Sequence, residues 1–331
     1  MTPFVFGGES VAPGARRTVP LQVSVLANNT PMNLPVHVVH GSSPGPVLFI
    51  SGVVHGDEIL GVEIVRRVLA HMKDVTLSGT LLAVPIVNSF GFLNHSRYLP
   101  DRRDLNRSFP GSDHGSLASL LADLFFREVV LRSQYGIDLH TAALHRTNLP
   151  QVRIAPDDAQ LKSLADAFAP PVVLTSKLRE GSLRLSAKEA GVKVLLYEGG
   201  EALRFDEEAI MAGVSGILRV MQSLHMLADA PAPETPVFSS SSSTWVRAPE
   251  GGILHSARTV GSRVSKDEII GVISDPLGED MVNVLAEDEG IIIGRTNLPV
   301  VNRGDALFHI ARIKTKSRGA VHAVPDEDEI I

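Results

Sequence analysis

Strand-like apolar runs alternate with segments of helical periodicity between residues 46 and 227, and this alternation most constrains the fold. Residues 46–54 form a continuous apolar run, as in a strand that is covered on both faces. Apolar residues at helical spacing follow over 59–72, and a second strand-like run covers 80–87. The alternation ends with a long helix predicted over 206–227. We expect an α/β fold with a mostly parallel or mixed central sheet and helices on both faces.

The pattern changes after residue 228. A Pro- and Ser-rich stretch at 229–243 predicts a linker or a crossing segment, and short β-runs between Gly and Asp turns then fill 244–315. We therefore predict an α/β unit over 1–228, a small all-β domain over 244–315 and a disordered acidic tail over 316–331. Residues 15–45, at the start of the first unit, predict only short strands and turns.

The predicted β domain contains a weak internal repeat. Residues 248–253 resemble 286–291, and residues 264–269 resemble 301–306. Two similar halves predict a small pseudo-symmetric barrel or sandwich.

Composition narrows the function classes. The absence of cysteine excludes disulfides and thiolate chemistry, so any metal must be held by His, Asp and Glu. A net charge of -6 gives no electrostatic reason to expect nucleic acid or an anionic membrane as partner. No apolar run approaches the ~20 residues of a membrane span, and no secretory signal is visible. We expect a cytoplasmic protein and leave open whether it forms a homo-oligomer.

Ionisable residues stand where two predicted strands end. His55 and Glu58 follow the first strand at a spacing that lets both side chains converge on one point. His140 ends a later strand, with Asp138 on the same side of that strand. Ligands of open α/β sheets bind beyond the carboxyl ends of the strands, and zinc accepts imidazole and carboxylate ligands. A carboxylate such as Asp138 commonly orients a ligating histidine. The alternatives are a helix cap for the first pair and surface polar residues for the second.

Two further stretches contain charged residues suited to substrate binding or catalysis. The loop from Arg97 to Gly111 is rich in arginine, which binds carboxylates in a bidentate manner; a solvated loop with local Asp–Arg pairs is the alternative. Glu198 ends an apolar strand and is followed by two glycines. In a partly desolvated site its pKa would rise, which suits a general base, whereas the alternative is a strand-end glutamate in solvent.

Together the motifs GVVHGDE, RRDLNRSFPG, DLHTA and LLYEGG resemble the succinylglutamate desuccinylase/aspartoacylase family over roughly residues 20–315. The resemblance implies a zinc carboxypeptidase-like fold and one Zn²⁺ per chain. The implied roles are zinc ligands (His55, Glu58, His140), catalytic base and acid (Glu198) and binding of a substrate carboxylate (Asn106, Arg107). An arginine that polarises the scissile carbonyl is also implied, and both Arg97 and Arg102 are candidates.

The predicted β domain resembles a biotinyl/lipoyl hybrid motif. A carrier domain of that type needs a lysine in the hairpin between its halves, and residues 278–285 contain none. We therefore expect a structural role, or a lid that narrows the mouth of the active site.

The favoured interpretation is a zinc-dependent amidohydrolase that removes an acyl group from a small, carboxylate-bearing N-acylated amino acid or related amine. One alternative is a zinc carboxypeptidase acting on peptides, which a lid would disfavour because a peptide needs an open groove. The other is a non-catalytic ligand-binding relative, whose signature would be loss of Glu198 or of a zinc ligand. All of these residues are present.

Overall fold

The computed structural model describes residues 1–25, 28–233 and 236–313 of the chain. The predicted tail over 316–331 lies outside the described residues. Among the residues that are described, no helix has both the length and the apolar character needed to cross a membrane.

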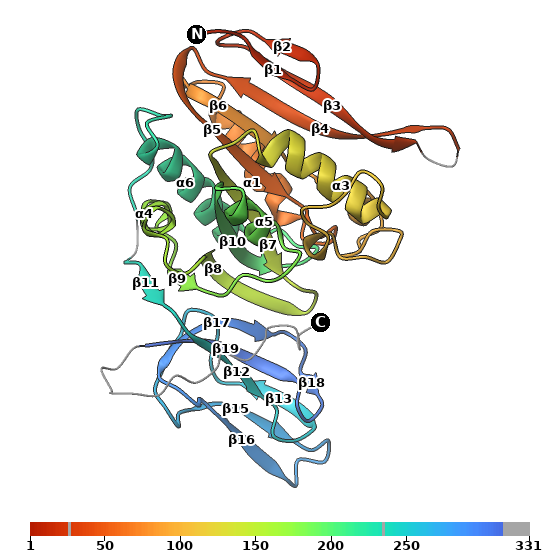
Figure 1. The fold of residues 1–331 in the computed structure, drawn as a ribbon. Coiled ribbons are helices and arrows are strands. Elements are labelled where there is room, and N and C mark those ends of the chain that lie inside the picture. The colour runs from red at the N-terminus through yellow and green to blue at the C-terminus, as the bar shows by residue number, and fades with distance from the viewer. Residues whose placement is uncertain (26–27, 234–235, 314–331) are drawn as a thin grey trace.

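A mixed sheet forms the centre of the molecule (Figure 1). Its four inner strands run parallel in the order β6-β5-β7-β10, and antiparallel neighbours extend it through β4 and β3 on one side and β8 on the other. The bounds of these strands are β3 (Arg16–Val25), β4 (Pro31–His40), β5 (Ser43–Gly52), β6 (Ser78–Val84), β7 (Tyr135–Ala142), β8 (Arg146–Ile154) and β10 (Lys193–Glu201). The expected α/β fold with a mixed sheet is confirmed.

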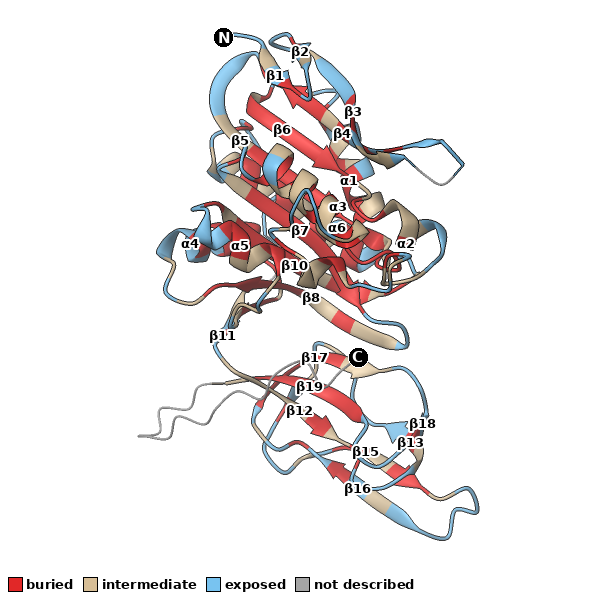
Figure 2. Ribbon diagram, turned by 45° about the vertical axis from the view of Figure 1, so that its right-hand side comes forward, coloured by how far each residue is buried: buried red, intermediate tan, exposed pale blue. Residues whose placement is uncertain are grey.

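Helices cover both faces of this sheet, and two core clusters lie beneath them (Figure 2). Leu48 and Ile50 of β5 belong to one cluster, whereas Phe49 between them belongs to the other, as expected for a strand buried on both sides. The helices over the first cluster are α1 (Leu60–His71), α4 (Ala159–Phe168) and α6 (Glu207–Ser223). Those over the second are α3 (Leu117–Phe125), its π-helical continuation η2 (Phe126–Val130) and α5 (Leu183–Glu189).

The N-terminal region differs from its prediction. Residues 15–45 were expected to form short strands and turns, but β3 and β4 are ten-residue strands that pair from Arg16↔Val39 to Val25↔Pro31. Alternate residues of these strands are buried, which is the pattern of a sheet with one solvated face. Two short strands, β1 (Phe4–Phe6) and β2 (Glu9–Val11), and the short helix α2 (Ser89–Leu93) were not predicted.

The C-terminal β region forms two facing sheets. Their strands are β12 (Ser243–Arg247), β13 (Gly252–Ser256), β14 (Arg263–Val264), β15 (Ile269–Ser274), β16 (Met281–Leu285), β17 (Gly290–Thr296), β18 (Val300–Val301) and β19 (Ala306–Arg312). The pairs β12–β19, β17–β19 and β17–β14 of one sheet correspond to β16–β15, β13–β15 and β13–β18 of the other. The internal repeat predicted from the sequence is therefore present in the strand pairing.

Hydrogen bonds join the C-terminal region to the central sheet, and the sequence did not predict this. Strand β17 pairs with β8 through Gly294↔Asn148, Arg295↔Thr147 and Thr296↔Arg146. Within the stretch predicted as a linker, β11 (Phe238–Ser240) pairs with β9 (Val172–Thr175). The division of the chain at 229–243 stays a prediction, because one sheet runs through both predicted units.

Candidate active site

A tight turn after β5 presents the first two site residues. Val53 is fully buried and adopts a left-handed backbone with φ 57°, a strained conformation for a β-branched residue. The backbone N–H of Glu58 donates to the carbonyl of His55, and α1 begins two residues later. This turn places His55 Nδ1 2.7 Å from Glu58 Oε1, with both side chains buried.

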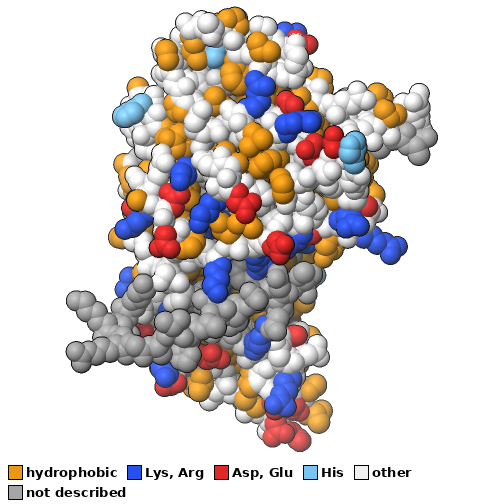
Figure 3. Space-filling model, viewed as in Figure 1, with side chains coloured by type: hydrophobic (Ala, Val, Ile, Leu, Met, Phe, Trp, Pro, Cys, Tyr) orange, Lys and Arg blue, Asp and Glu red, His pale blue; other side chains and the backbone are white. Residues whose placement is uncertain are grey.

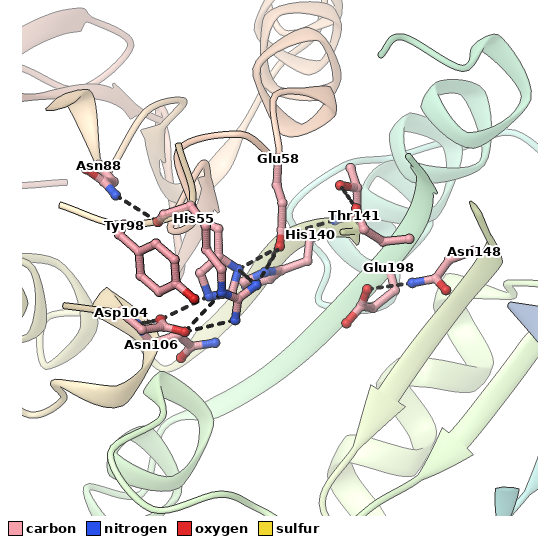
Figure 4. A network of polar contacts seen from close by, with 12 residues as sticks. His55, Glu58, Asn88, Tyr98, Asp104, Asn106, His140, Thr141, Asn148 and Glu198 are labelled. Carbon is pink, nitrogen blue, oxygen red and sulfur yellow. Dashed lines mark hydrogen bonds and ion pairs between the residues drawn. The ribbon is translucent and has the colours of Figure 1, made fainter. Parts of the chain in front are cut away.

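The third residue arrives from the neighbouring parallel strand. His140 lies near the end of β7, and its Nδ1 is 2.7 Å from Glu58 Oε2. The backbone N–H of Thr141 also donates to that oxygen. The Glu58 carboxylate thus lies between two imidazoles, as Figure 4 shows. The sheet brings together residues that are far apart in the sequence because β5 and β7 end at the same edge.

Each histidine is held by a second carboxylate through its other nitrogen. Asp138 Oδ2 lies 2.8 Å from His140 Nε2, and Asp104 Oδ1 lies 3.1 Å from His55 Nε2. Asp138 in turn accepts a hydrogen bond of 2.8 Å from the hydroxyl of Ser51. Because a carboxylate is acceptor-only, these contacts keep a proton on Nε2 and orient each ring so that its Nδ1 faces Glu58.

Electrostatics couples these groups tightly. Burial disfavours the charged form of each, yet the opposite charges outweigh burial: the pKa of Glu58 is well below its usual range, and the pKa values of His55 and His140 are raised. Burial would also raise the pKa of Asp104, but His55 and Arg97 outweigh burial and lower it. The Glu58 carboxylate is therefore held ionised between the two imidazoles.

This arrangement fits a divalent cation. One ligand atom from each of His55, Glu58 and His140 lies within 4.8 Å of the others, and all three residues are buried. Two imidazole nitrogens and one carboxylate oxygen are a donor set that leaves a coordination position open. The three predicted ligands are brought together, and the carboxylates behind the histidines have the arrangement usual around metal ligands.

The two arginine candidates occupy different places. Arg97 lines the cavity next to the cluster; its Nη2 donates to Asp104 Oδ2 at 2.8 Å and its Nη1 lies 3.4 Å from Glu58 Oε1. Arg102 is exposed in a left-handed turn and does not line the cavity. The structure therefore brings Arg97, and not Arg102, to the other predicted site residues.

A close crossing of two backbones holds Arg97 there. A Cβ on Gly56 would lie 2.0 Å from the carbonyl carbon of Gly91 and 2.3 Å from the carbonyl oxygen of Ser96. The N–H of Gly56 also faces the carbonyl oxygen of Arg97 at 3.4 Å. Glycine at position 56 is thus required for the loop after α2 to approach the His55–Glu58 turn.

Asn106 and Arg107 lie in the single turn η1 (Leu105–Arg107), which the Asp104 side chain caps by accepting from the N–H of Asn106. Both residues line the cavity. The Asn106 amide oxygen accepts from the N–H of Leu183, and the Arg107 Nη1 donates to the carbonyl of Asn106. These contacts fix the turn so that its side chains face the same space as the histidine cluster.

Glu198 enters from β10, where it lies opposite His140 in the parallel pairing. Its side chain is largely buried, at 14% exposure. Asn148 Nδ2 on β8 donates to Glu198 Oε2 at 2.9 Å, and Arg153 Nε lies 3.8 Å from Oε1. In Figure 4 Glu198 and Asn148 lie on one side of the histidine cluster and Asp104 lies on the other. The carboxylate is therefore positioned separately from the histidine cluster.

These residues surround one cavity of about 180 Å³. At ~10–15 Å³ of such space for one water, this corresponds to roughly a dozen waters, the scale of an amino-acid derivative. Trp245 and His309 of the C-terminal region also line the cavity, which agrees with a lid role for that region. Several lining or supporting residues were not predicted from the sequence: Asp104, Arg146, Asn148, Arg153, Arg179, Arg184, Trp245 and His309.

Only one of these omissions had a usable signal. Asp104 stands inside the RRDLNR motif, two residues before Asn106. The others come from strands, loops and, for Arg184, helix α5, whose approach to the cavity depends on tertiary packing.

Comparisons with known proteins agree with this geometry. Residues 44–224 match the model of the succinylglutamate desuccinylase/aspartoacylase catalytic domain. The chain is 28% identical over 303 residues to the N-alpha-acetyl-L-2,4-diaminobutyric acid deacetylase of Halomonas elongata, covering 85% of this chain and 86% of that one.

Two solved structures share the fold. A succinylglutamate desuccinylase/aspartoacylase of Rhodobacter sphaeroides has a TM-score of 0.80 at 23% identity and covers 91% of this chain and 96% of its own. The product-bound ectoine utilization protein EutE of Ruegeria pomeroyi has a TM-score of 0.79 at 20% identity, with 90% and 95% covered. The names of the family and of the similar deacetylase describe removal of acyl groups from N-acylated amino acids. With more than half of its length matched by the family model, this chain belongs to the succinylglutamate desuccinylase/aspartoacylase family.

Proposed function

We propose that this protein is a zinc-dependent amidohydrolase that releases the amine from a small N-acylated amino acid. The observation that carries the proposal is the convergence of His55, Glu58 and His140 on one point of the cavity, with Glu198 facing the same cavity. The printed name of the curated relative, a deacetylase of an acetylated diamino acid, supports the reaction class.

His55 and His140 would hold the cation through Nδ1, and Glu58 through a carboxylate oxygen. When bound, zinc supplies a positive charge that polarises a carbonyl and lowers the pKa of water. Zinc is favoured because the donor set is two imidazoles and one carboxylate without a thiolate.

The remaining roles belong to side chains around the cation site. Glu198 accepts a proton from the attacking water and returns it to the leaving amine. Arg97, 3.4 Å from Glu58, supplies positive charge for the developing oxyanion. Asn106 and Arg107 bind a carboxylate of the substrate, since a guanidinium and an amide together donate several hydrogen bonds to it. Arg102 has no role in this scheme because its side chain is outside the cavity.

The test combines metal content with turnover. Elemental analysis should find about one zinc per chain, and a screen of N-acyl amino acids should release free amine only from zinc-loaded protein. His140→Ala should lose the metal. Glu198→Gln should keep it but lower turnover by about 100- to 10,000-fold, because glutamine preserves shape and cannot take the proton. Wild-type turnover in Glu198→Gln would refute the assignment of the base.

Arg107→Ala provides the contrast. It should keep the metal and raise KM more than it lowers kcat, because the variant removes a contact made by the bound substrate as well as in the transition state. Equal metal content in wild type and His140→Ala would overturn the ligand assignment, whatever the outcome for Glu198.

A further inference from the structure

The cavity has the opposite charge to the protein as a whole. Six of its described lining residues are arginines, namely Arg97, Arg107, Arg146, Arg153, Arg179 and Arg184, whereas the acidic lining residues are Glu58 and Glu198. The chain has a net charge of -6, and Figure 3 shows acidic and basic side chains interspersed over the outer face drawn there. Arginine is therefore the commonest charged residue around the cavity.

Arg146 differs from the other arginines in how it is held. Arg97 is paired with Asp104, and Arg153 lies 3.8 Å from Glu198. The Nη1 of Arg146 is buried without a hydrogen-bond partner, and its guanidinium makes no ion pair within the described part of the chain. Burial and the nearby Arg247 lower its pKa, with Asp305 opposing this from a distance. A half-buried cation without a counter-ion among the described residues favours an anion from outside.

An aromatic platform fixes the position of this guanidinium. The Arg146 guanidinium lies over the Trp245 ring at 5.3 Å from its centroid, and Trp245 stacks on His309 at 4.5 Å and 9°. Arg146 begins β8 and pairs with Thr296 of β17, while Trp245 lies on β12 of the C-terminal region. Stacking on a ring leaves the edge of a guanidinium free to donate two parallel hydrogen bonds to a carboxylate.

We propose that Arg146, supported by Trp245, forms a second carboxylate subsite, which selects substrates that carry a carboxylate in addition to the one bound by Arg107. This rests on the proposed deacylase function and goes beyond it by naming the specificity residue. A substrate with an ammonium group at this position is disfavoured, because the ammonium would meet the same uncompensated positive charge. The second carboxylate comes either from the side chain of the amino acid or from the far end of the acyl group.

Matched substrates separate these two sources. N-acetylglutamate and N-acetylglutamine differ only in a side-chain carboxylate against its amide. N-succinylglutamine and its succinamoyl counterpart differ in the same way at the acyl end. In at least one pair, the carboxylate should have a kcat/KM about 10- to 100-fold higher than its amide, the effect of one charge-assisted contact. Nα-acetyl-2,4-diaminobutyrate, which carries an ammonium, should be poorer than the favoured dicarboxylate.

Variants of Arg146 and Trp245 test whether these residues cause the preference for a carboxylate over its amide. Arg146→Gln should lower the carboxylate-to-amide ratio of kcat/KM to within about threefold of one. Trp245→Leu should also reduce the ratio, whereas Trp245→Phe, which keeps an aromatic face, should retain most of it. The control is Arg66→Gln, which removes an exposed arginine of α1 far from the cavity lining and should leave the ratio unchanged. A ratio near one in the wild type, or an unchanged ratio in Arg146→Gln, would overturn the subsite.

Binding measurements test the Arg146 subsite independently of the proposed deacylase activity. If none of the substrates is hydrolysed, the deacylase proposal fails, and calorimetry with N-acetylglutamate, the succinylated compound and their amides then tests the subsite directly. Tighter binding of a dicarboxylate to wild type, lost in Arg146→Gln, would still support it. Equal binding of carboxylate and amide in both pairs would refute it.

Discussion

The side-chain amide of Asn148 donates a hydrogen bond of 2.9 Å to Oε2 of Glu198, and the same residue joins three strands. Asn148 lies on β8, where it pairs with Gly200 of β10 on one side and with Gly294 of β17 on the other. A Cβ on Gly294 would lie only 2.9 Å from the amide oxygen of Asn148. The C-terminal region thus packs directly against the residue that orients the proposed base.

Replacing Asn148 with alanine should lower kcat by about tenfold or more with little change in KM, because Glu198 loses a hydrogen bond of a kind typically worth ~1.5–3 kcal/mol. Metal content should stay unchanged. Steady-state kinetics on zinc-loaded protein checks this. Asn297→Ala is the matched control, since Asn297 lies at the same strand junction but contacts Thr147 and Glu201. Similar kinetics in the two variants would argue against a positioning role.

The carboxylates behind the histidines should determine metal affinity. Asp138→Asn and Asp104→Asn keep an acceptor near Nε2 but remove the negative charge, so each should weaken zinc binding by about 10- to 100-fold. Competition with a chromophoric chelator measures this. Asp123→Asn, whose side chain lies 3.7 Å from Arg127 on the surface, is the control. Unchanged affinity in both site variants would show that these carboxylates serve the fold alone.

Gly56→Ala should disrupt the site through sterics. The added methyl group meets the backbone of Gly91 and Ser96, which cannot yield as a flexible side chain would. We expect a loss of at least ~1–3 kcal/mol in stability, the usual cost of overpacking, together with reduced metal content. Thermal unfolding and elemental analysis report the two effects. Gly251→Ala should be tolerated, because its nearest contact would be an ordinary 3.5 Å.

Asp158 should make stability depend on pH. It caps α4 and accepts from Lys193 Nζ at 2.6 Å; burial opposes its charge, but Lys193 and the helix N–H groups prevail and lower its pKa. Because the folded pKa lies below the unfolded value of about 3.9, this contribution is present above that pH and is lost as pH falls below it.

Asp158→Asn keeps the cap acceptor but removes the charge. The difference in urea midpoint between wild type and Asp158→Asn should therefore be larger at pH 7 than at pH 3. When Lys193→Gln is added to both of these proteins, the difference in their urea midpoints at pH 7 should become smaller. A pH-independent difference would contradict the linkage.

Sequence patterns predicted those parts of the fold and site that depend on local order. Leu48, Phe49 and Ile50 mark a strand because all three are apolar. The strand that precedes His55 and the strands that carry His140 and Glu198 end at one edge because parallel strands share their direction. Because ligands bind beyond the carboxyl ends of such strands, the sequence predicted that the three metal ligands lie close together.

The remaining features depend on contacts that no local pattern encodes. The approach of Asp104 to His55 requires the Gly56–Gly91 crossing, and the place of Asn148 next to Glu198 requires the order β7-β10-β8 in the sheet. The pairing of β17 with β8 joins segments more than a hundred residues apart, and no local pattern specifies that partner. The choice between Arg97 and Arg102 likewise needed the path of the loop, because both are arginines of one irregular segment.

The matched strand pairing of the C-terminal region has an evolutionary consequence. Its first half runs from β12 to β15 and its second from β16 to β19. The two halves are equivalent in their strand pairings, as expected of a duplicated ancestral segment. Among the described residues, only the second copy pairs a strand with the central sheet, through Gly294 to Thr296. The two copies are therefore constrained in different ways: the second by its pairing with the central sheet, and the first by Trp245, which lines the cavity.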